Sequence, residues 1–265
     1  MRKFLLTIAG LWAALLSVAG QQLDSVRTHS IDSMLVNYLA AIETEPLRVK
    51  TEECDFMISA CTDSLLKQYT AVRLYEHFFS SKLMGDDAVA IHIYDKWFAP
   101  KTVRMYSEID AMNAGIFAEF NRQTLIGREA PVMEMTDKKG ERVRIPGKGV
   151  YSVLFFYDTG CKTCRAESEL LNKSLGKGLF DVNFYAIYIN DDRASWEEFI
   201  AEKLTIDCPE VKVFHLWDPM QETDFLRAYG LIQTPRLFLV SPDGRIIGRG
   251  LDTESLVQLL MVYLN

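Results

Sequence analysis

The fold is decided by the stretch Leu154-Phe155-Phe156-Tyr157-Asp158-Thr159-Gly160-Cys161-Lys162-Thr163-Cys164-Arg165. Its first part closes a continuous β-rich run over positions 150–157 that is bounded by glycines. Such a run predicts a strand that is buried on both faces. Its second part opens a helical pattern that continues to about position 175. The C-x-x-C motif is therefore expected between a buried strand and the first turn of a helix, a context that indicates redox chemistry.

The position of Cys161 at the start of a helix predicts its chemistry. Backbone N–H groups in a first helical turn have no partner within the helix, and together with the positive end of the helix dipole they stabilise a thiolate. We therefore expect a lowered pKa for Cys161, which makes it the candidate nucleophile in disulfide exchange. Cys164, one turn further in, is expected to attack the resulting mixed disulfide, and Lys162 adds positive charge nearby.

Three other interpretations of this cysteine pair stay open. The pair can form a purely structural disulfide, or it can be an inactive remnant in a protein that only binds. It can also be half of a zinc site, which needs two further ligands at suitable spacing. Cys208 and His215 are available, but they stand seven positions apart in a different segment, and no second C-x-x-C exists. We therefore expect no metal and no cofactor.

After Gly127 the sequence alternates between strand and helix patterns. A hairpin is predicted over 132–145. Further strands are expected over 150–157, 182–189, 211–216, 236–240 and 245–248, and helices over 161–175, 196–203, 222–228 and 252–264. This order predicts an α/β domain in which helices flank a mixed central sheet.

The preceding segment, from about Asp24 to Leu125, carries apolar residues at every third or fourth position. Such spacing predicts amphipathic helices that pack on each other, and hence an all-α N-terminal domain. A shorter helix is expected over 88–98. The three apolar stripes are Ile31, Met34, Leu35, Tyr38, Leu39 and Ile42; Leu66, Tyr69, Val72, Tyr75, Phe79 and Leu83; and Val103, Tyr106, Ile109, Met112, Ile116, Phe117 and Phe120.

Several motifs of the second half occur together in one known family. They are Gly127-Arg128-Glu129-Ala130-Pro131, the Phe-rich strand before Cys161, Gln233-Thr234-Pro235, and the turn Ser241-Pro242-Asp243-Gly244-Arg245. With these motifs, residues 126–265 resemble the thioredoxin-like proteins, and among them the exported bacterial TlpA/ResA branch. The resemblance implies a thioredoxin-like fold, a cis-proline at Pro235 facing the cysteines, and a Thr234 whose backbone groups pair with an incoming chain.

Two positions depart from the pattern of that family. Phe155 stands where most thioredoxins hold a buried aspartate, and Gly160 replaces the aromatic residue before the nucleophile. Proton transfer from Cys164 therefore needs another group. ResA-like members carry a glutamate three residues after the second cysteine, and Glu167 occupies that position, one helical turn beyond Cys164. The resemblance makes Glu167 the candidate general base; the alternative is a solvated carboxylate on an exposed helix face.

The N-terminus has the layout of a secretory signal. Arg2 and Lys3 precede an uncharged run over 4–19 that ends in small residues. Polar or small residues interrupt this run, which falls short of the roughly 18–20 continuous apolar residues that span a bilayer, although an uncleaved membrane anchor is the alternative. We expect a signal peptide over 1–20, a helical domain over 21–125 and a thioredoxin-like domain over 126–265, in a protein that is soluble in the periplasm or elsewhere outside the cytoplasm.

The leading hypothesis for function is a thiol-disulfide oxidoreductase that acts on exported proteins. Its expected partners are disulfide-containing exported proteins and an upstream dithiol electron donor, membrane-bound or free. The resemblance favours a reductase, although the redox potential sets the direction. The formal charge of −7 comes without a run of lysines and arginines, which excludes nucleic acid as a partner.

Two alternatives to this function belong to different classes. A peroxiredoxin-like peroxidase expects P-x-x-x-T-x-x-C, and Leu154 and Asp158 occupy the Pro and Thr positions of that pattern before Cys161. A non-enzymatic binding protein would use the helical domain as its interface and keep an inactive thioredoxin fold.

The remaining cysteines are expected to be structural. Cys54 and Cys61 stand seven positions apart, a rise of about 10 Å in one helix, beyond the roughly 7 Å limit for a disulfide. They are predicted to be buried thiols, and Cys208 a packed thiol. Asp191 and Asp192 are predicted to cap the helix that follows them.

Overall fold

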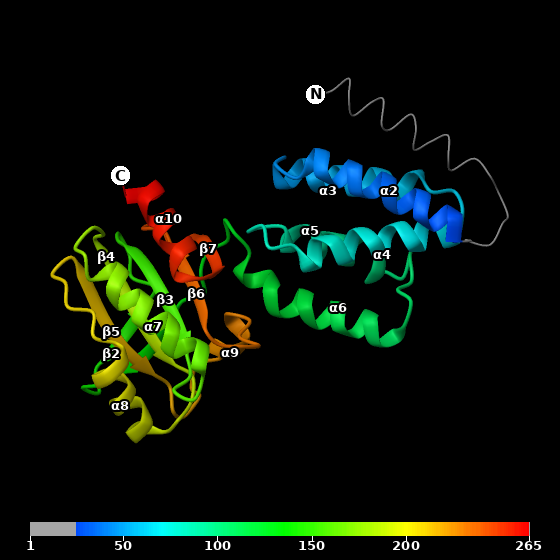
Figure 1. Ribbon diagram of the computed structural model, residues 1–265. Helices are drawn as coiled ribbons and strands as arrows, with labels where there is room; N and C mark the ends of the chain where they lie inside the picture. Colours follow the sequence, from blue (N-terminus) through cyan, green and yellow to red (C-terminus); the bar gives the residue numbers. More distant parts are fainter. Residues whose placement is uncertain (1–24, 265) are drawn as a thin grey trace. The chain divides into compact units, whose positions relative to one another are not determined.

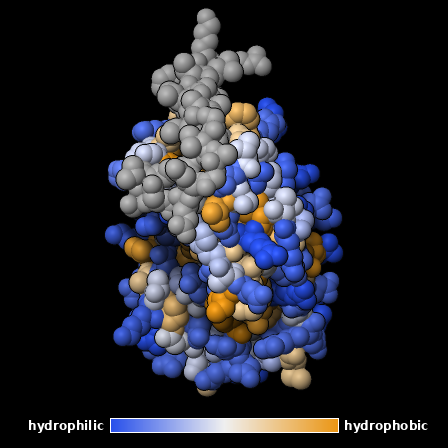
Figure 2. Space-filling model, turned by 90° about the vertical axis from the view of Figure 1, so that its right-hand side faces the viewer, coloured by the Kyte–Doolittle hydropathy of each residue, from blue (hydrophilic) through white to orange (hydrophobic). Residues whose placement is uncertain are grey.

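The computed structural model describes residues 25–264, so the predicted signal peptide lies outside the described residues. The chain divides into two compact units, with the boundary between Glu119 and Phe120 (Figure 1). None of the described helices combines the length and the apolar character that crossing a bilayer requires. Figure 2 shows a face with mainly hydrophilic side chains, interrupted by separate apolar patches.

The first unit is helical. Its helices are α2 (Ser25–Ile42), α3 (Leu47–Ala60), α4 (Ser64–Ser80), α5 (Asp87–Ile93), the π-helical turn η1 (Tyr94–Phe98) and α6 (Glu108–Asn121). The stripe predicted for α2 is buried at Ile31, Leu35, Tyr38, Leu39 and Ile42, with Met34 packed against them. Cys54 and Cys61 are buried free thiols, as predicted.

Two predictions for this unit are wrong in part. In the second stripe, Phe79 and Leu83 are 49% and 47% exposed, and Leu83 lies beyond the end of α4. The expected third stripe does not form the buried face of α6, because Ile109 is 66% and Met112 is 59% exposed. The buried residues of α6 include Ala114 and Ala118, small side chains that let neighbouring backbones approach closely, and Phe117 packs edge-on against Phe79 of α4. The apolar period is helical, but the helix is rotated about its axis relative to the expectation.

The second unit contains one seven-stranded sheet in the order β2-β1-β5-β4-β3-β6-β7. The strands are β1 (Met133–Asp137), β2 (Arg142–Ile145), β3 (Tyr151–Tyr157), β4 (Val182–Tyr188), β5 (Val211–Trp217), β6 (Arg236–Val240) and β7 (Ile246–Leu251). β3 runs parallel to β4 and antiparallel to β6, so the sheet is mixed. Its helices are α7 (Lys162–Leu175), α8 (Arg193–Lys203), α9 (Phe225–Ala228) and α10 (Thr253–Leu264), with a short 3-10 turn, η2 (Arg122–Thr124), ahead of the sheet.

Helices cover both faces of this sheet, as predicted. On one face, Leu171 of α7, Phe199 of α8 and Leu256 of α10 pack into a core with alternate residues of β3. On the other face, Phe225 of α9 belongs to a second core that takes the intervening residues of β3. β3 is therefore buried on both faces, which explains the continuous apolar run of its sequence.

Candidate active site

Cys161 lies at the junction between the buried strand β3 and helix α7. The turn that leads to it is fixed by Asp158, whose carbonyl oxygen accepts from the Cys161 N–H (3.2 Å) and whose carboxylate accepts from the Gly160 N–H (2.9 Å). Cys161 has an extended backbone and occupies the N-cap position of α7. A buried strand, a hydrogen-bonded turn and a helix start thus hold the cysteine in place.

The sulfur of Cys161 accepts hydrogen bonds that favour its ionised form. The backbone N–H of Cys164 donates to the Cys161 Sγ at 3.1 Å, so the sulfur acts as the cap of its own helix. Burial would raise the pKa of Cys161, but hydrogen bonds from Cys164, from Thr234 and from the Thr163 backbone outweigh it, and the net shift is downward. The geometry supports the expected thiolate.

Cys164 is fully buried and has the opposite electrostatic character. Burial raises its pKa, and the neighbouring Cys161 raises it further, against a smaller lowering from the backbone of Asp158. Phe155 is buried and stacked on Tyr157, so this position has no carboxylate, unlike the buried aspartate of most thioredoxins. The pKa of Cys164 is therefore raised while that of Cys161 is lowered, so Cys161 is the sulfur that ionises more readily.

The loop before β6 lies against the reactive sulfur. The Cys161 Sγ is 3.6 Å from the carbonyl oxygen of Thr234, and the Thr234–Pro235 peptide bond is cis. Ile232, two residues earlier, is 66% exposed. Of the residues named from the sequence, Cys161, Cys164 and Thr234 are thus brought together, with Pro235 adjoining them.

Glu167 is placed differently from the other candidates. Its carboxylate Oε2 accepts from the backbone N–H of Thr253 (3.1 Å) and from the Thr253 hydroxyl, at the start of α10. The carboxylate thereby ties α7 to α10. A role for Glu167 as a base for Cys164 stays a prediction.

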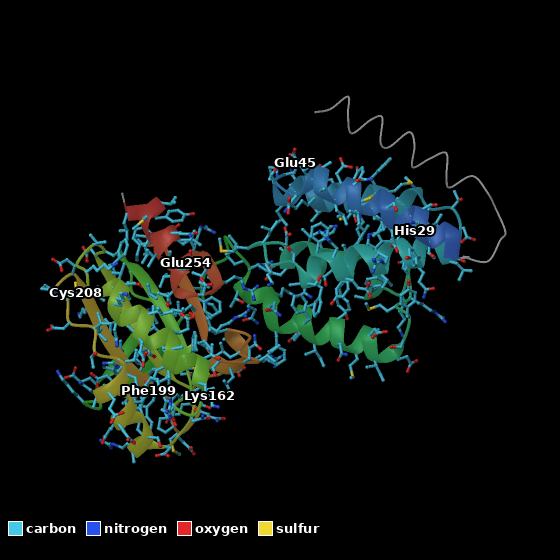
Figure 3. The ribbon with its side chains drawn as sticks, viewed as in Figure 1. His29, Glu45, Lys162, Phe199, Cys208 and Glu254 are labelled. Carbon is cyan, nitrogen blue, oxygen red and sulfur yellow. The ribbon has the colours of Figure 1, made fainter. Side chains whose placement is uncertain are left out.

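The sequence reasoning missed the contacts that Arg165 makes beside the nucleophile. Nε and Nη2 of Arg165 donate to the carbonyl oxygen of Thr159 at 3.2 and 3.1 Å. The loop that carries Thr159 and Gly160 borders, together with α8, a cavity of about 230 Å³. In Figure 3, Lys162 marks the start of α7 and Phe199 lies on α8. Cys208 lies apart from both, nearer the other end of the sheet. The one sequence signal for such a contact is that Arg165 directly follows the C-x-x-C motif.

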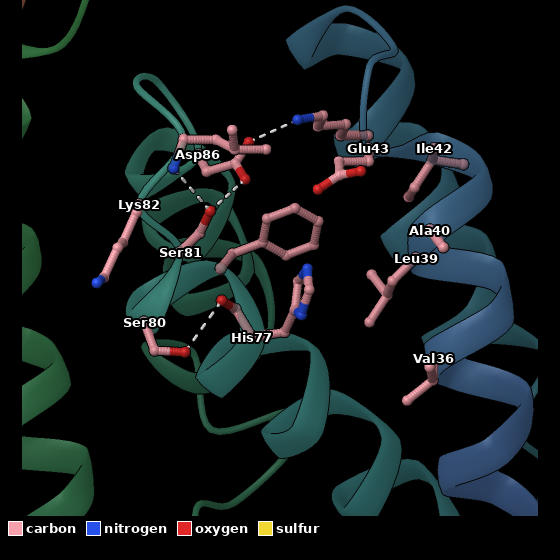
Figure 4. Close-up of a pocket in the computed structure, with 13 residues that line it drawn as sticks. Val36, Leu39, Ala40, Ile42, Glu43, His77, Ser80, Ser81, Lys82 and Asp86 are labelled. Carbon is pink, nitrogen blue, oxygen red and sulfur yellow. Dashed lines mark hydrogen bonds and ion pairs between the residues drawn. The ribbon is translucent and has the colours of Figure 1, made fainter. Parts of the chain in front are cut away.

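A larger cavity, about 580 Å³, lies in the helical unit between α2 and α4 (Figure 4). Val36 and Leu39 of α2 form one wall, opposite His77 of α4. Its polar end holds the buried ion pair between Lys50 and Asp86, whose atoms are 2.6 Å apart. None of its lining residues is a cysteine, so this cavity supplies no thiol chemistry.

Comparison with known proteins finds similarity over the C-terminal unit. The model of the AhpC/TSA family matches residues 126–249. This match covers most of the C-terminal unit, which is therefore similar to this family. The chain is also similar to the thiol-disulfide oxidoreductase ResA of Bacillus cereus (strain ATCC 10987 / NRS 248), with 28% identity over 136 residues that cover 46% of this chain and 67% of the relative. ResA of Geobacillus thermodenitrificans is 26% identical over 156 residues, covering 55% of this chain and 82% of that protein.

A solved structure extends the similarity in fold to the helical unit. The thioredoxin-like protein from Bacteroides caccae aligns with a TM-score of 0.67 and 18% identity, covering 89% of this chain and 84% of that one. The predicted thioredoxin-like fold is thereby confirmed. The relatives confirm the expected class of enzyme, a thiol-disulfide oxidoreductase; roles of individual residues and the clients are proposals below.

Proposed function

We propose that the chain exchanges dithiols and disulfides with exported proteins, with Cys161 as nucleophile and Cys164 as resolving thiol. The Cys161 thiolate attacks one sulfur of a client disulfide and forms a mixed disulfide, and the other client sulfur leaves as a thiolate. Cys164 then loses its proton and attacks the Cys161 sulfur, which releases the second client thiol. The client gains two electrons, and the enzyme is left with a Cys161–Cys164 disulfide. The single observation that carries this proposal is the Cys161 Sγ at the helix start, accepting the Cys164 N–H.

Thr234 and Pro235 are proposed to hold the client chain. An extended peptide can pair with the backbone of Thr234, in the manner of an added strand. The Thr234 carbonyl lies 3.6 Å from the reactive sulfur, so a peptide held there has its own sulfur within reach of Cys161. The exposed Ile232 offers apolar surface beside this position.

Glu167 is proposed to accept the Cys164 proton, in competition with its tie to Thr253. Replacement of Glu167 by Gln removes the base but keeps an oxygen that accepts from Thr253. Thr253→Val removes one hydroxyl donor and leaves the carboxylate. If Glu167 is the base, Glu167→Gln slows release from the mixed disulfide about tenfold or more, a typical general-base effect being at least this large, whereas Thr253→Val does not. Equal release rates in Glu167→Gln and the wild type would contradict this role.

The direction of exchange is proposed to be reduction of clients. Regeneration then needs an upstream dithiol donor, because each turnover leaves the enzyme oxidised by two electrons. The signal-like sequence of residues 1–20 supports export, and the proposed location of the reaction is the periplasm or another compartment outside the cytoplasm, where disulfides persist.

Insulin reduction tests the proposed activity directly. The chain is assayed with dithiothreitol as the donor, beside Cys161→Ser and Cys164→Ser. We expect catalysed precipitation of insulin with the wild type, none above background with Cys161→Ser, and an accumulating mixed disulfide with Cys164→Ser. Equal rates for the wild type and Cys161→Ser would refute the assignment of the nucleophile.

A further inference from the structure

The cavity between α2 and α4 has the size and the walls of a small-molecule site. Its volume of about 580 Å³ falls within the roughly 300–1,000 Å³ that is typical of such sites. Ligand sites usually combine apolar walls with a few polar groups. The cavity therefore suits a ligand with an apolar body and one polar group. Its apolar lining consists of Val36, Leu39, Ala40, Ile42, Phe78 and Leu83.

The polar end of this cavity holds a charged side chain with unused hydrogen-bond donors. Lys50 and Asp86 line this end, and their side chains are only 8% and 5% exposed. An ammonium group has three N–H donors. Within the described part of the chain, Lys50 uses one of them, in a 2.6 Å hydrogen bond to the Asp86 Oδ1. Because buried donors without an acceptor are costly, an acceptor atom next to Lys50 is favourable.

The carboxylates around this end disfavour an anionic ligand. The Asp86 carboxylate also accepts from the Ser81 hydroxyl at 2.7 Å. Glu43 lines the cavity as well, and Figure 4 shows its carboxylate directed from α2 toward α4, whereas Lys82 points away. An anion placed at Lys50 therefore lies close to two carboxylates. A cation meets the Lys50 ammonium and offers it no acceptor, so an uncharged oxygen fits best.

A second polar group faces the cavity from α4. His77 lines the cavity, and its ring nitrogens form no hydrogen bond with any of residues 25–264. Burial lowers the pKa of His77, against smaller opposing effects of Asp86 and Glu43, so the ring is mainly neutral at pH 7. A neutral imidazole has one donor and one acceptor nitrogen. The polar end can therefore accept a hydrogen bond from the ligand as well as donate to it.

We propose that this cavity binds an uncharged small molecule that consists of an amide group and an aliphatic chain. The amide carbonyl oxygen accepts from Lys50, and the amide N–H donates to His77 or Glu43. The chain lies along Val36 and Leu39. The site belongs to the helical unit, and its binding does not depend on the exchange chemistry proposed for Cys161.

The test compares three probes that share an aliphatic chain and differ in the head group. Octanamide is uncharged, octanoate is an anion and octylammonium is a cation. Isothermal titration calorimetry with the full chain gives a Kd for each probe. We expect octanamide to bind about tenfold more tightly than either charged probe, because only octanamide gives Lys50 an acceptor without adding a charge.

Two variants assign this binding to the cavity. Ala40→Trp fills the cavity from α2 and should weaken octanamide binding about tenfold or more. Ala41→Trp is the matched control, because Ala41 is exposed on the same helix and does not line the cavity. Lys50→Met/Asp86→Leu replaces the buried pair as a whole, so no charge is left unpaired, and should weaken octanamide binding about tenfold. Circular dichroism without ligand checks that each variant is folded; if the double variant is not, Ala40→Trp decides.

Equal affinity for the three probes would overturn the proposal, and so would tighter binding of octanoate or octylammonium. Octanamide binding that is absent, or that is the same in Ala40→Trp and the wild type, would overturn it as well. None of these results bears on the exchange function, which the insulin assay tests separately.

Discussion

At the scale of single residues, the site gives two identical side chains different reactivity. Cys161 and Cys164 are one helical turn apart, yet the pKa of the first is lowered and that of the second is raised. The difference comes from position alone: one sulfur meets N–H groups at the helix start, and the other lies in an apolar core beneath it.

The pH dependence of alkylation tests this difference. A thiolate reacts with iodoacetamide and a thiol does not, so the rate falls as the pH drops through the pKa of Cys161. Because that pKa is lowered, we expect the midpoint for Cys161 below that of an ordinary cysteine, which is about 8.5. Mass spectrometry of Cys164→Ser gives the rate for Cys161, and Cys161→Ser gives it for Cys164, with a midpoint above the ordinary value. A shared midpoint would contradict the assignment.

The ion pair between Lys50 and Asp86 lies in the interior of the helical unit. Both side chains are at least nine-tenths buried. Lys50→Met leaves the Asp86 carboxylate buried without its partner, and we expect a loss of about 3–5 kcal/mol in the free energy of unfolding. Arg48→Met, on the same helix, breaks an exposed pair with Glu52 and should cost less than about 0.5 kcal/mol. Urea denaturation of both variants measures the contrast; similar losses would contradict it.

At the scale of elements, the segment between α9 and Thr234 is fixed by a close backbone approach. Gly230 has φ of +60°, and a Cβ there would stand 2.0 Å from the carbonyl oxygen of Phe120. The same segment leads into the residues that face Cys161. Its position is therefore set by the backbone at Phe120, the first residue of the second unit, as well as by the sheet.

Substitution of this glycine should be costly for two reasons. Gly230→Ala combines a left-handed backbone with an overlap against backbone atoms, and we expect a loss of about 2–5 kcal/mol. Gly244→Ala is the control, because φ is +88° there but nothing lies within 4 Å of the added Cβ, so only about 1–2 kcal/mol is expected. Thermal melts compare the two, and an equal loss would show that the overlap relaxes freely.

The strands could be predicted from the sequence more reliably than the helical faces. A strand buried on both faces has a continuous apolar run, so β3 was found within one residue of its start. For α6 the period indicates a helix but does not say which partner covers it, and Ala114 and Ala118 gave no apolar signal. The helix α3 was not singled out, because Lys50 and Cys54 stand on its buried face beside Met57 and Ile58, so few strongly apolar residues mark that face.

Some features of the candidate site could likewise be predicted from the sequence and others could not. Cys161 and Cys164 follow from local spacing, since the helix start that activates the thiol lies in the same segment. The tie between Glu167 and Thr253 joins residues 86 positions apart, and no local pattern encodes it. The cavity beside Gly160 depends on where α8 packs, which the sequence alone did not indicate.

At the scale of the whole molecule, each unit has its own apolar core, and the residues just before the sheet belong with the second unit. Asn121 is buried, and its side-chain oxygen accepts from Arg249 of β7 (2.5 Å). Gly230 packs against Phe120. The segment 120–125 therefore contributes to the thioredoxin-like unit, ahead of the boundary expected at position 126.

Two fragments test where this unit begins. We expect residues 120–265 to unfold in one cooperative transition. Residues 126–265 lose Asn121 as the acceptor for Arg249, a charged hydrogen bond worth about 1.5–3 kcal/mol, and should melt about 5 °C lower. Calorimetry of the two fragments measures the difference. Identical melting temperatures would place the start of the unit at position 126.

The capping of α7 by the Cys161 sulfur affects the fate of each captured client. In the mixed disulfide this sulfur is neutral and accepts the Cys164 N–H only weakly, so the adduct has two exits. In the first, the free client thiolate attacks the client sulfur of the mixed disulfide and expels the Cys161 thiolate. This thiolate leaves readily because its pKa is low. The second needs Cys164 to ionise inside the core. Whether a client is reduced or released unchanged therefore depends on how fast the buried Cys164 ionises and attacks, compared with the return of the client thiolate.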